Sequence, residues 1–191
     1  LEITYRMSRT LVIGDIHGGH KALLQCLERS SFDYENDTLI SLGDIVDGWS
    51  EVYECVEELL KIKNLIAIKG NHDEFFNEYL TKGSHPIKWL HGGYSTVDSY
   101  AKHTGKDIGL YSQNGGWVTD LTFADVPPSH LNFFKNQLLY HVDDKNRLFV
   151  HGGFEMEHTV KAIEKINPSI FYWDRHMWST AKYFQTIGKN K

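Results

Sequence analysis

Short apolar runs alternate with longer stretches of helical periodicity through the first 80 residues of the chain. The runs have the length and apolar content of buried strands, and the intervening stretches repeat apolar residues at helical spacing. The predicted strands are residues 10–13, 38–42 and 65–69, and the predicted helices are residues 20–29, 50–62 and 74–80. This alternation is typical of parallel strands joined by right-handed crossovers, so we expect an α/β fold with a sheet buried on both faces.

The periodicity weakens after residue 80. Residues 83–116 are rich in glycine and polar side chains, which predicts an insertion with short helices. A helix is expected from the Pro-Pro pair at 127–128 to residue 137, followed by strands at 138–142 and 147–150 around a turn. This hairpin would add an antiparallel part to a second sheet, and residues 1–191 are expected to form one domain that lacks its C-terminal strands.

Composition narrows the classes of partner. The 191 residues carry a net charge of −5, which argues against duplex nucleic acid, and no apolar stretch of membrane-spanning length occurs, so we expect no membrane partner. Cys26 and Cys55 fall on predicted helices and are interpreted as reduced packing residues, which favours a cytoplasmic location. The five tryptophans are interpreted as core and cleft packing, with a platform for a nucleobase as the alternative; they are Trp49, Trp89, Trp117, Trp173 and Trp178.

Metal-ligand side chains follow the ends of separate predicted strands. They are Asp15, His17, Asp44, Asn71 and His151. In open α/β sheets the carboxyl ends of the strands share one edge, so these side chains are expected to converge. Mixed oxygen and nitrogen ligands without a thiolate suit Mn²⁺, with Fe or Zn²⁺ as alternatives.

Asp44 is the candidate ligand for two cations, because one carboxylate can bridge a pair of metals about 3.5–4 Å apart. Such a pair would activate a water for in-line attack on phosphorus. His72 lies next to a candidate ligand and could supply the proton for the leaving group as general acid, with Asp47 as its carboxylate partner. Each motif taken alone could be a simple turn, but three in order after apolar strands favour a metal site.

The four segments 14–18, 43–49, 70–73 and 151–154 read GDIHG, GDIVDGW, GNHD and HGGF. This set resembles the signature of the calcineurin-like metallophosphoesterase superfamily, in its phosphoprotein phosphatase branch. The resemblance implies a metallo-dependent phosphatase fold, in which two mixed β-sheets are flanked by helices. It implies one metal on Asp15, His17 and Asp44, and a second on Asp44, Asn71 and His151, with His72 and Asp47 as the catalytic pair.

The chain departs from this family pattern at two points. Gly48 and Trp49 stand where the family has Arg-Gly, so the usual phosphate-binding arginine is absent. Arg175 resembles a downstream family arginine and, with Asn71, is the predicted substrate-binding residue; a surface salt bridge is the alternative for Arg175. A late family histidine for the second metal is also missing, and the second His-Gly-Gly, at 91–93, is assigned with 94–100 to a cleft wall instead of a ligand.

The sequence therefore predicts a metal-dependent phosphomonoester hydrolase, of the serine/threonine protein phosphatase type, that acts through water without a phospho-enzyme. Its partners would be a phosphorylated protein or a small phosphoester. A symmetrical dinucleoside tetraphosphate hydrolase is the first alternative. A catalytically impaired metal-binding scaffold that docks phosphoproteins is the second.

Overall fold

A computed structural model describes residues 7–83, 92–113 and 116–188 of the chain. Its centre is a parallel sheet in the order β1-β2-β3, formed by Thr10–Ile13, Thr38–Ser41 and Asn64–Ala67. Two helices make the crossovers, α1 (His20–Arg29) between β1 and β2 and α2 (Val52–Leu60) between β2 and β3. The predicted α/β alternation is thus confirmed for this part of the chain.

The three strands are not buried equally. The central strand β2 places Leu39 and Ile40 in the interior, whereas Val12 of β1 is 47% exposed. The prediction of a sheet buried on both faces is therefore wrong for β1, because only one face of this edge strand lies against the core.

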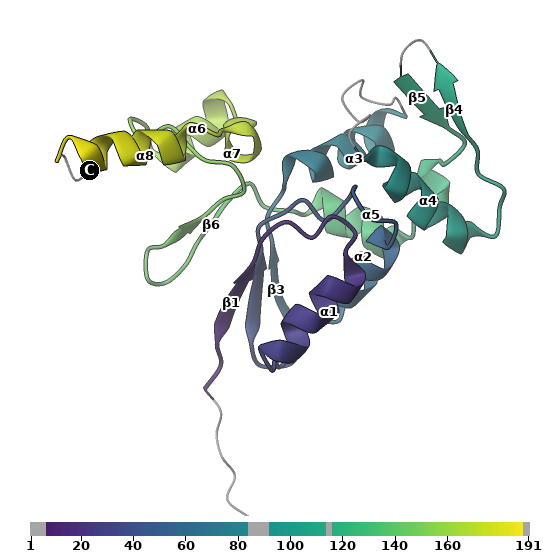
Figure 1. The fold of residues 1–191 in the computed structure, drawn as a ribbon, viewed down its shortest axis with the longest axis horizontal. Helices are drawn as coiled ribbons and strands as arrows, with labels where there is room; N and C mark the ends of the chain where they lie inside the picture. Colours follow the sequence, from purple (N-terminus) through teal and green to yellow (C-terminus); the bar gives the residue numbers. More distant parts are fainter. Residues whose placement is uncertain (1–6, 84–91, 114–115, 189–191) are drawn as a thin grey trace, which may run out of the picture.

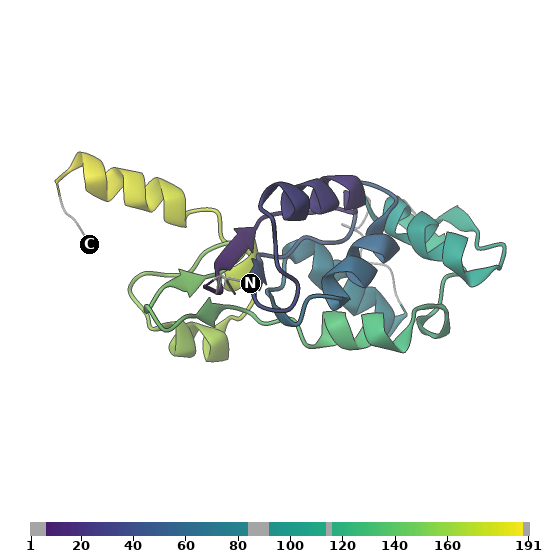
Figure 2. The same cartoon turned by 90° about the horizontal axis from the view of Figure 1, so that it is seen from below.

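One apolar core joins the helices that follow the sheet in sequence. α3 (Asn71–Lys82), α4 (Gly93–Thr104) and α5 (Pro128–Lys135) bury Phe76, Tyr100 and Phe134 together. Figures 1 and 2 show α1 to α5 gathered on one side of the parallel sheet and the C-terminal segment on the other. α3 begins at Asn71, three residues before the predicted start, which places a helix N-terminus at the end of β3.

The insertion at 83–116 contains α4, as predicted, but also begins an unpredicted hairpin. β4 (Leu110–Gln113) pairs antiparallel with β5 (Gly116–Thr119), and a short 3₁₀ turn, η2 (Phe123–Asp125), follows. His91, at the start of the predicted cleft wall, lies outside the described residues, as does Trp89.

The predicted strand 138–142 is divided in two. Leu138 extends the parallel sheet: it bridges Ile68, and its N–H donates to Ala67 O at 2.8 Å. β6 is only His141–Val142 and pairs with β7 (Leu148–Phe149) as a separate antiparallel hairpin, so the described strands lie in three sheets. The chain continues through α6 (Val160–Ile166), α7 (Ile170–Trp173) and α8 (Met177–Thr186).

Several predicted packing residues are exposed. Trp49 is 71% exposed, Trp178 70% and Trp173 42%, so core packing is the wrong interpretation for these three. Trp173 is only partly covered, by Phe75 of α3, and Trp178 lies beneath the side chain of Lys182. Cys55 is buried as predicted, but Cys26 is exposed because it faces away from the apolar side of α1. Within the described ranges, no helix has both the length and the apolar character needed to cross a bilayer.

Candidate metal centre

The loops after β1 and β2 are joined through their backbones. The amides of Ile16 and His17 both donate to the carbonyl of Asp44, at 3.0 and 2.8 Å. Asp44 has a φ of 51° and His17 one of 46°, a conformation that non-glycine residues adopt rarely and that clusters at functional sites. These contacts place the side chains of the first two motifs on the same side of the sheet edge.

The third motif meets the second through a glycine. A Cβ on Gly70 would lie 2.1 Å from Asp44 Oδ1, so only glycine lets this carboxylate approach the start of α3. Asp44 Oδ1 then accepts from the backbone N–H of His72 at 2.9 Å. Asp44 therefore lies against a helix N-terminus, where negative charge is stabilised.

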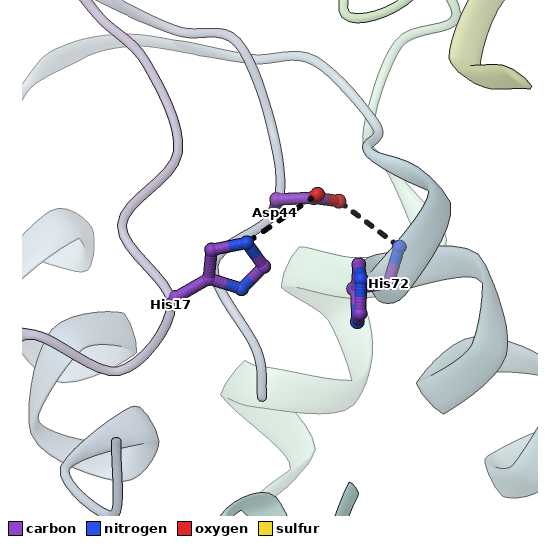
Figure 3. A group of neighbouring side chains, drawn as sticks. All are labelled: His17, Asp44 and His72. Carbon is purple, nitrogen blue, oxygen red and sulfur yellow. Dashed lines mark hydrogen bonds and ion pairs between the residues drawn. The ribbon is translucent and has the colours of Figure 1, made fainter. Parts of the chain in front are cut away.

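Two imidazoles face the other oxygen of Asp44. Oδ2 lies 3.7 Å from His17 Nε2 and 3.5 Å from His151 Nε2. Figure 3 shows His17 directed at the Asp44 carboxylate, with the His72 backbone on its opposite side. Three separate segments thus bring potential ligands to one carboxylate, as the strand-end argument predicted.

The hydrogen bonds of these imidazoles define which nitrogen is free to bind a metal. His17 Nδ1 lies 2.9 Å from Val46 O, and His151 Nδ1 lies 3.0 Å from Leu42 O. A carbonyl only accepts, so each Nδ1 carries a proton, and in the neutral imidazole Nε2 is the nitrogen that can bind a metal. Backbone carbonyls orient metal-binding histidines in this way in many proteins.

Asn71 adds another lone pair to the same space. Its Oδ1 accepts from Arg175 Nη2 at 2.9 Å and lies 3.1 Å from His151 Nε2. Asn71 Oδ1 and, in the neutral imidazole, His151 Nε2 therefore offer two ligand atoms to a cation beside the Asp44 carboxylate. The residues present thus fit divalent metal binding, through the chemistry of their donor atoms.

The candidate donors form two groups that share Asp44. One is His17, Asp44 and His72, and the other is Asp15, Asp44 and His151; within each group the ligand atoms lie within 4.8 Å of one another. These groups differ from the predicted sets, since Asp15 groups with His151 and His72 groups with His17. The assignment of ligands to each metal stays a prediction.

His72 has the carboxylate partner that the sequence predicted. Its Nδ1 lies 2.7 Å from Asp47 Oδ2, and Asp47 is completely buried. The hydrogen bond to Asp47 raises the pKa of His72 and outweighs burial, and the charge of Asp44 acts in the same direction. A raised pKa favours the imidazolium, which can donate a proton.

Asp73 is a site residue to which the sequence reasoning gave no role. Its buried carboxylate accepts from the amides of Ile45 at 2.8 Å and Gly70 at 3.1 Å, and from Gln137 Nε2 at 2.8 Å. It therefore joins the second and third motifs beneath Asp44. Burial raises the pKa of Asp73, and the charge of Asp44 raises it further. The hydrogen bonds from these N–H donors lower the pKa but do not cancel that rise. Its place in the motif GNHD was the available signal.

The loop at position 48, where the family has an arginine, is too crowded for a side chain. Gly48 has a φ of 81°, and a Cβ there would lie 2.9 Å from His17 Cβ and 3.0 Å from His17 O. This loop therefore has no space for a side chain at position 48. Arg175, by contrast, reaches the site through Asn71, as described above.

Comparisons with known proteins place these features in context. The calcineurin-like phosphoesterase family profile matches residues 8–183. The serine/threonine-protein phosphatase 1 of Salmonella typhimurium is 26% identical over 142 residues, which cover 69% of this chain and 65% of that protein. The symmetrical bis(5'-nucleosyl)-tetraphosphatase of Pseudomonas fluorescens is 25% identical, over 80% of this chain and 45% of that protein. The chain thus spans less than two thirds of these curated relatives.

A solved structure has a similar fold. The crystal structure of a putative diadenosine tetraphosphatase superposes with a TM-score of 0.54 at 18% identity, covering 82% of this chain and 59% of that one. This likeness supports the predicted metallo-dependent phosphatase fold. The family match extends over nearly all described residues and includes all four motifs, so the chain belongs to the calcineurin-like phosphoesterase family.

Proposed function

We propose that this chain is a metal-dependent phosphomonoester hydrolase of the serine/threonine protein phosphatase type. The observation that carries the proposal is the Asp47–His72 pair, at 2.7 Å, beside the shared carboxylate Asp44. A histidine that is hydrogen-bonded to a buried carboxylate is suited to act as the general acid that protonates a leaving group. The proposal extends to two divalent ions, with Mn²⁺ as the first candidate and Fe or Zn²⁺ as alternatives, since mixed oxygen and nitrogen donors suit all three.

In this proposal Asp15, His17, Asp44, Asn71 and His151 hold the ions. When bound, the ions would lower the pKa of a water and neutralise charge on the phosphate oxygens. His72 gives its proton to the leaving oxygen as the P–O bond breaks, while Asp47 keeps the imidazole oriented. Arg175, which already donates to Asn71, offers further N–H groups to a phosphate oxygen.

The decisive variant is His72→Asn. Loss of the proton donor should lower kcat by about 10²–10⁴-fold while bound metal, measured by elemental analysis, stays the same. His158→Asn, an exposed histidine away from the site, is the matched control. If His72→Asn loses metal instead, His72 is a ligand; if its rate is unchanged, the proton-donor role is wrong.

A second candidate function is hydrolysis of a symmetrical dinucleoside tetraphosphate. The observation that favours it is a pair of exposed indoles near the site: Trp49 follows the Asp47–Gly48 turn, and Trp173 packs 5.5 Å from Phe75, itself next to His72. Exposed aromatic side chains can stack on nucleobases. The names of several relatives point the same way.

One assay compares the candidates. A phosphopeptide, p-nitrophenyl phosphate and a dinucleoside tetraphosphate are tested side by side, with Mn²⁺ and with chelator. We expect the highest kcat/KM for the phosphopeptide; preference for the dinucleotide would establish the second candidate. Metal binding without turnover of any substrate would indicate the impaired scaffold.

We also propose that the chain forms a single domain and that the protein is cytoplasmic.

A further inference from the structure

Thr96, on α4, contacts Asp47 from the side opposite His72. Its buried hydroxyl accepts the N–H of Asp47 at 2.9 Å and donates to Asp47 Oδ1 at 2.6 Å. We propose that Thr96 is a positioning residue for proton transfer: it fixes the Asp47 carboxylate, which in turn orients His72. This inference rests on the proposed function.

The two oxygens of Asp47 have different partners. Oδ1 accepts from Thr96, and Oδ2 lies 2.7 Å from His72 Nδ1. The terminal torsion of an aspartate is broad and two-fold when nothing restrains it. With both oxygens engaged, the carboxylate plane is fixed, so His72 Nε2 keeps one direction toward the site.

Thr96 also stabilises an unusual backbone. Asp47 has a φ of 68°, which costs free energy for a residue with a Cβ. The hydrogen bond from its N–H to Thr96 compensates part of this cost. A Cβ on Gly92 would lie 2.8 Å from Asp47 Cβ, so the start of α4 also packs directly on this turn.

α4 is itself well anchored and can act as a rigid support. Tyr100 is fully buried and stacks on Phe76 at 5.3 Å between ring centres. Because Phe76 lies on the same helix as His72, α4 supports both members of the catalytic pair.

The test exploits the chemistry of a proton donor. A poor leaving group, such as the serine of a phosphopeptide, needs a proton, whereas p-nitrophenolate leaves well without one. Thr96→Val, which keeps the shape and removes the hydroxyl, should lower kcat for the phosphopeptide by about 10–100-fold and for p-nitrophenyl phosphate much less. KM and metal content should be unchanged, and Thr96→Ser should restore the rate.

Ser99→Ala is the control, since it removes a buried hydroxyl from the same helix without touching Asp47. Thr96→Ala replaces the valine variant if the latter does not fold. Equal losses on both esters, or failure of serine to restore the rate, would overturn the proposal.

A second readout needs no turnover. In ¹H–¹⁵N NMR the His72 Nδ1 proton, hydrogen-bonded to Asp47, should give a downfield resonance that Thr96→Val weakens or shifts and Ser99→Ala does not. An unchanged resonance would also refute the proposal. If the wild type hydrolyses no phosphomonoester, the proposed function fails, and this resonance still decides whether Thr96 positions His72.

Discussion

Residues 10–82 and residues 138–188 contribute to the same site but differ in how they are packed. The first region buries most of its apolar residues in one core and supplies Asp44, Asn71 and His72. The second supplies His151 and Arg175, while the large apolar side chains of Ile166, Trp178 and Tyr183 remain mostly exposed. Figure 1 shows α8 extending away from the rest of the molecule.

The difference shows that the carboxylates of the metal centre and the arginine at its edge are held in place by different parts of the chain. Asp44 and Asp73 are fixed by backbone amides of the first region. Arg175 is oriented by carbonyls of its own segment, Tyr172 O at 3.3 Å and Asp174 O at 3.0 Å. Substitutions at Asp44 or Asp73 should therefore affect metal binding and stability, whereas substitutions at Arg175 should affect substrate binding.

The largest effect is expected from Asp44→Asn. An amide cannot serve as a charged bridge between two cations, so both metal positions should empty and turnover should fall below detection. Elemental analysis and a phosphopeptide assay measure the two outcomes. Asp144→Asn, on an exposed loop, should leave both unchanged; full metal content in Asp44→Asn would show that Asp44 is not shared.

The packing difference predicts unequal changes in stability. Phe76→Ala removes a fully buried ring and should lower the free energy of unfolding by about 3–5 kcal/mol. Trp178→Ala removes an exposed ring and should change it by less than about 0.5 kcal/mol. Urea unfolding followed by circular dichroism measures both. Similar losses for the two variants would mean that the regions are packed alike.

An ion pair between the buried Asp37 and the partly exposed Arg9, at the base of the sheet, predicts a pH dependence of stability. The hydrogen bond from Arg9 holds the pKa of the Asp37 carboxyl well below its usual range, and the carboxylate is 1% exposed. A depressed pKa contributes stability above the unfolded value of about 3.9, and this stability is lost as the pH falls toward the folded value.

Asp37→Asn should therefore cost about 1.5–3 kcal/mol at pH 7, and the difference from the wild type should shrink as the pH falls below about 4. Urea unfolding at pH 7, 5 and 3 measures this trend. A difference that stays constant with pH would show that the charge of Asp37 is unimportant.

The smallest effect is expected from Arg175→Gln. Loss of a charged donor beside Asn71 should raise KM for a phosphopeptide about tenfold, with metal content unchanged. Arg147→Gln, which removes an exposed arginine paired with Asp143, is the control. If Arg175→Gln binds substrate normally, Arg175 has only a structural role.

Much of the centre could be predicted because its information is local. An apolar strand followed by glycine and a ligand residue defines both the strand end and the chemistry there, as for Asp15 and Asp44. The pairing of His72 with Asp47 likewise followed from the motifs, and the distance between them agrees with it. The family prediction is confirmed by the profile match.

The remaining features depend on contacts distant in sequence. Thr96 meets Asp47 across 49 residues, and no periodicity of α4 distinguishes its hydroxyl from others on that helix. Cys26 and Trp178 have apolar side chains, so composition predicted packing, but which helix face is covered depends on tertiary arrangement. The hairpin β4–β5 was missed because polar residues and glycines obscure its alternation.

The five-residue loop 42–46 couples the two candidate metal positions mechanically. Its first carbonyl, Leu42 O, orients His151; its last, Val46 O, orients His17; and Asp44 stands midway. The length of this short loop therefore fixes how far apart the two carbonyls that orient His151 and His17 lie. Inserting a single residue there would disturb both positions together, so neither could be retuned for another metal independently of its neighbour.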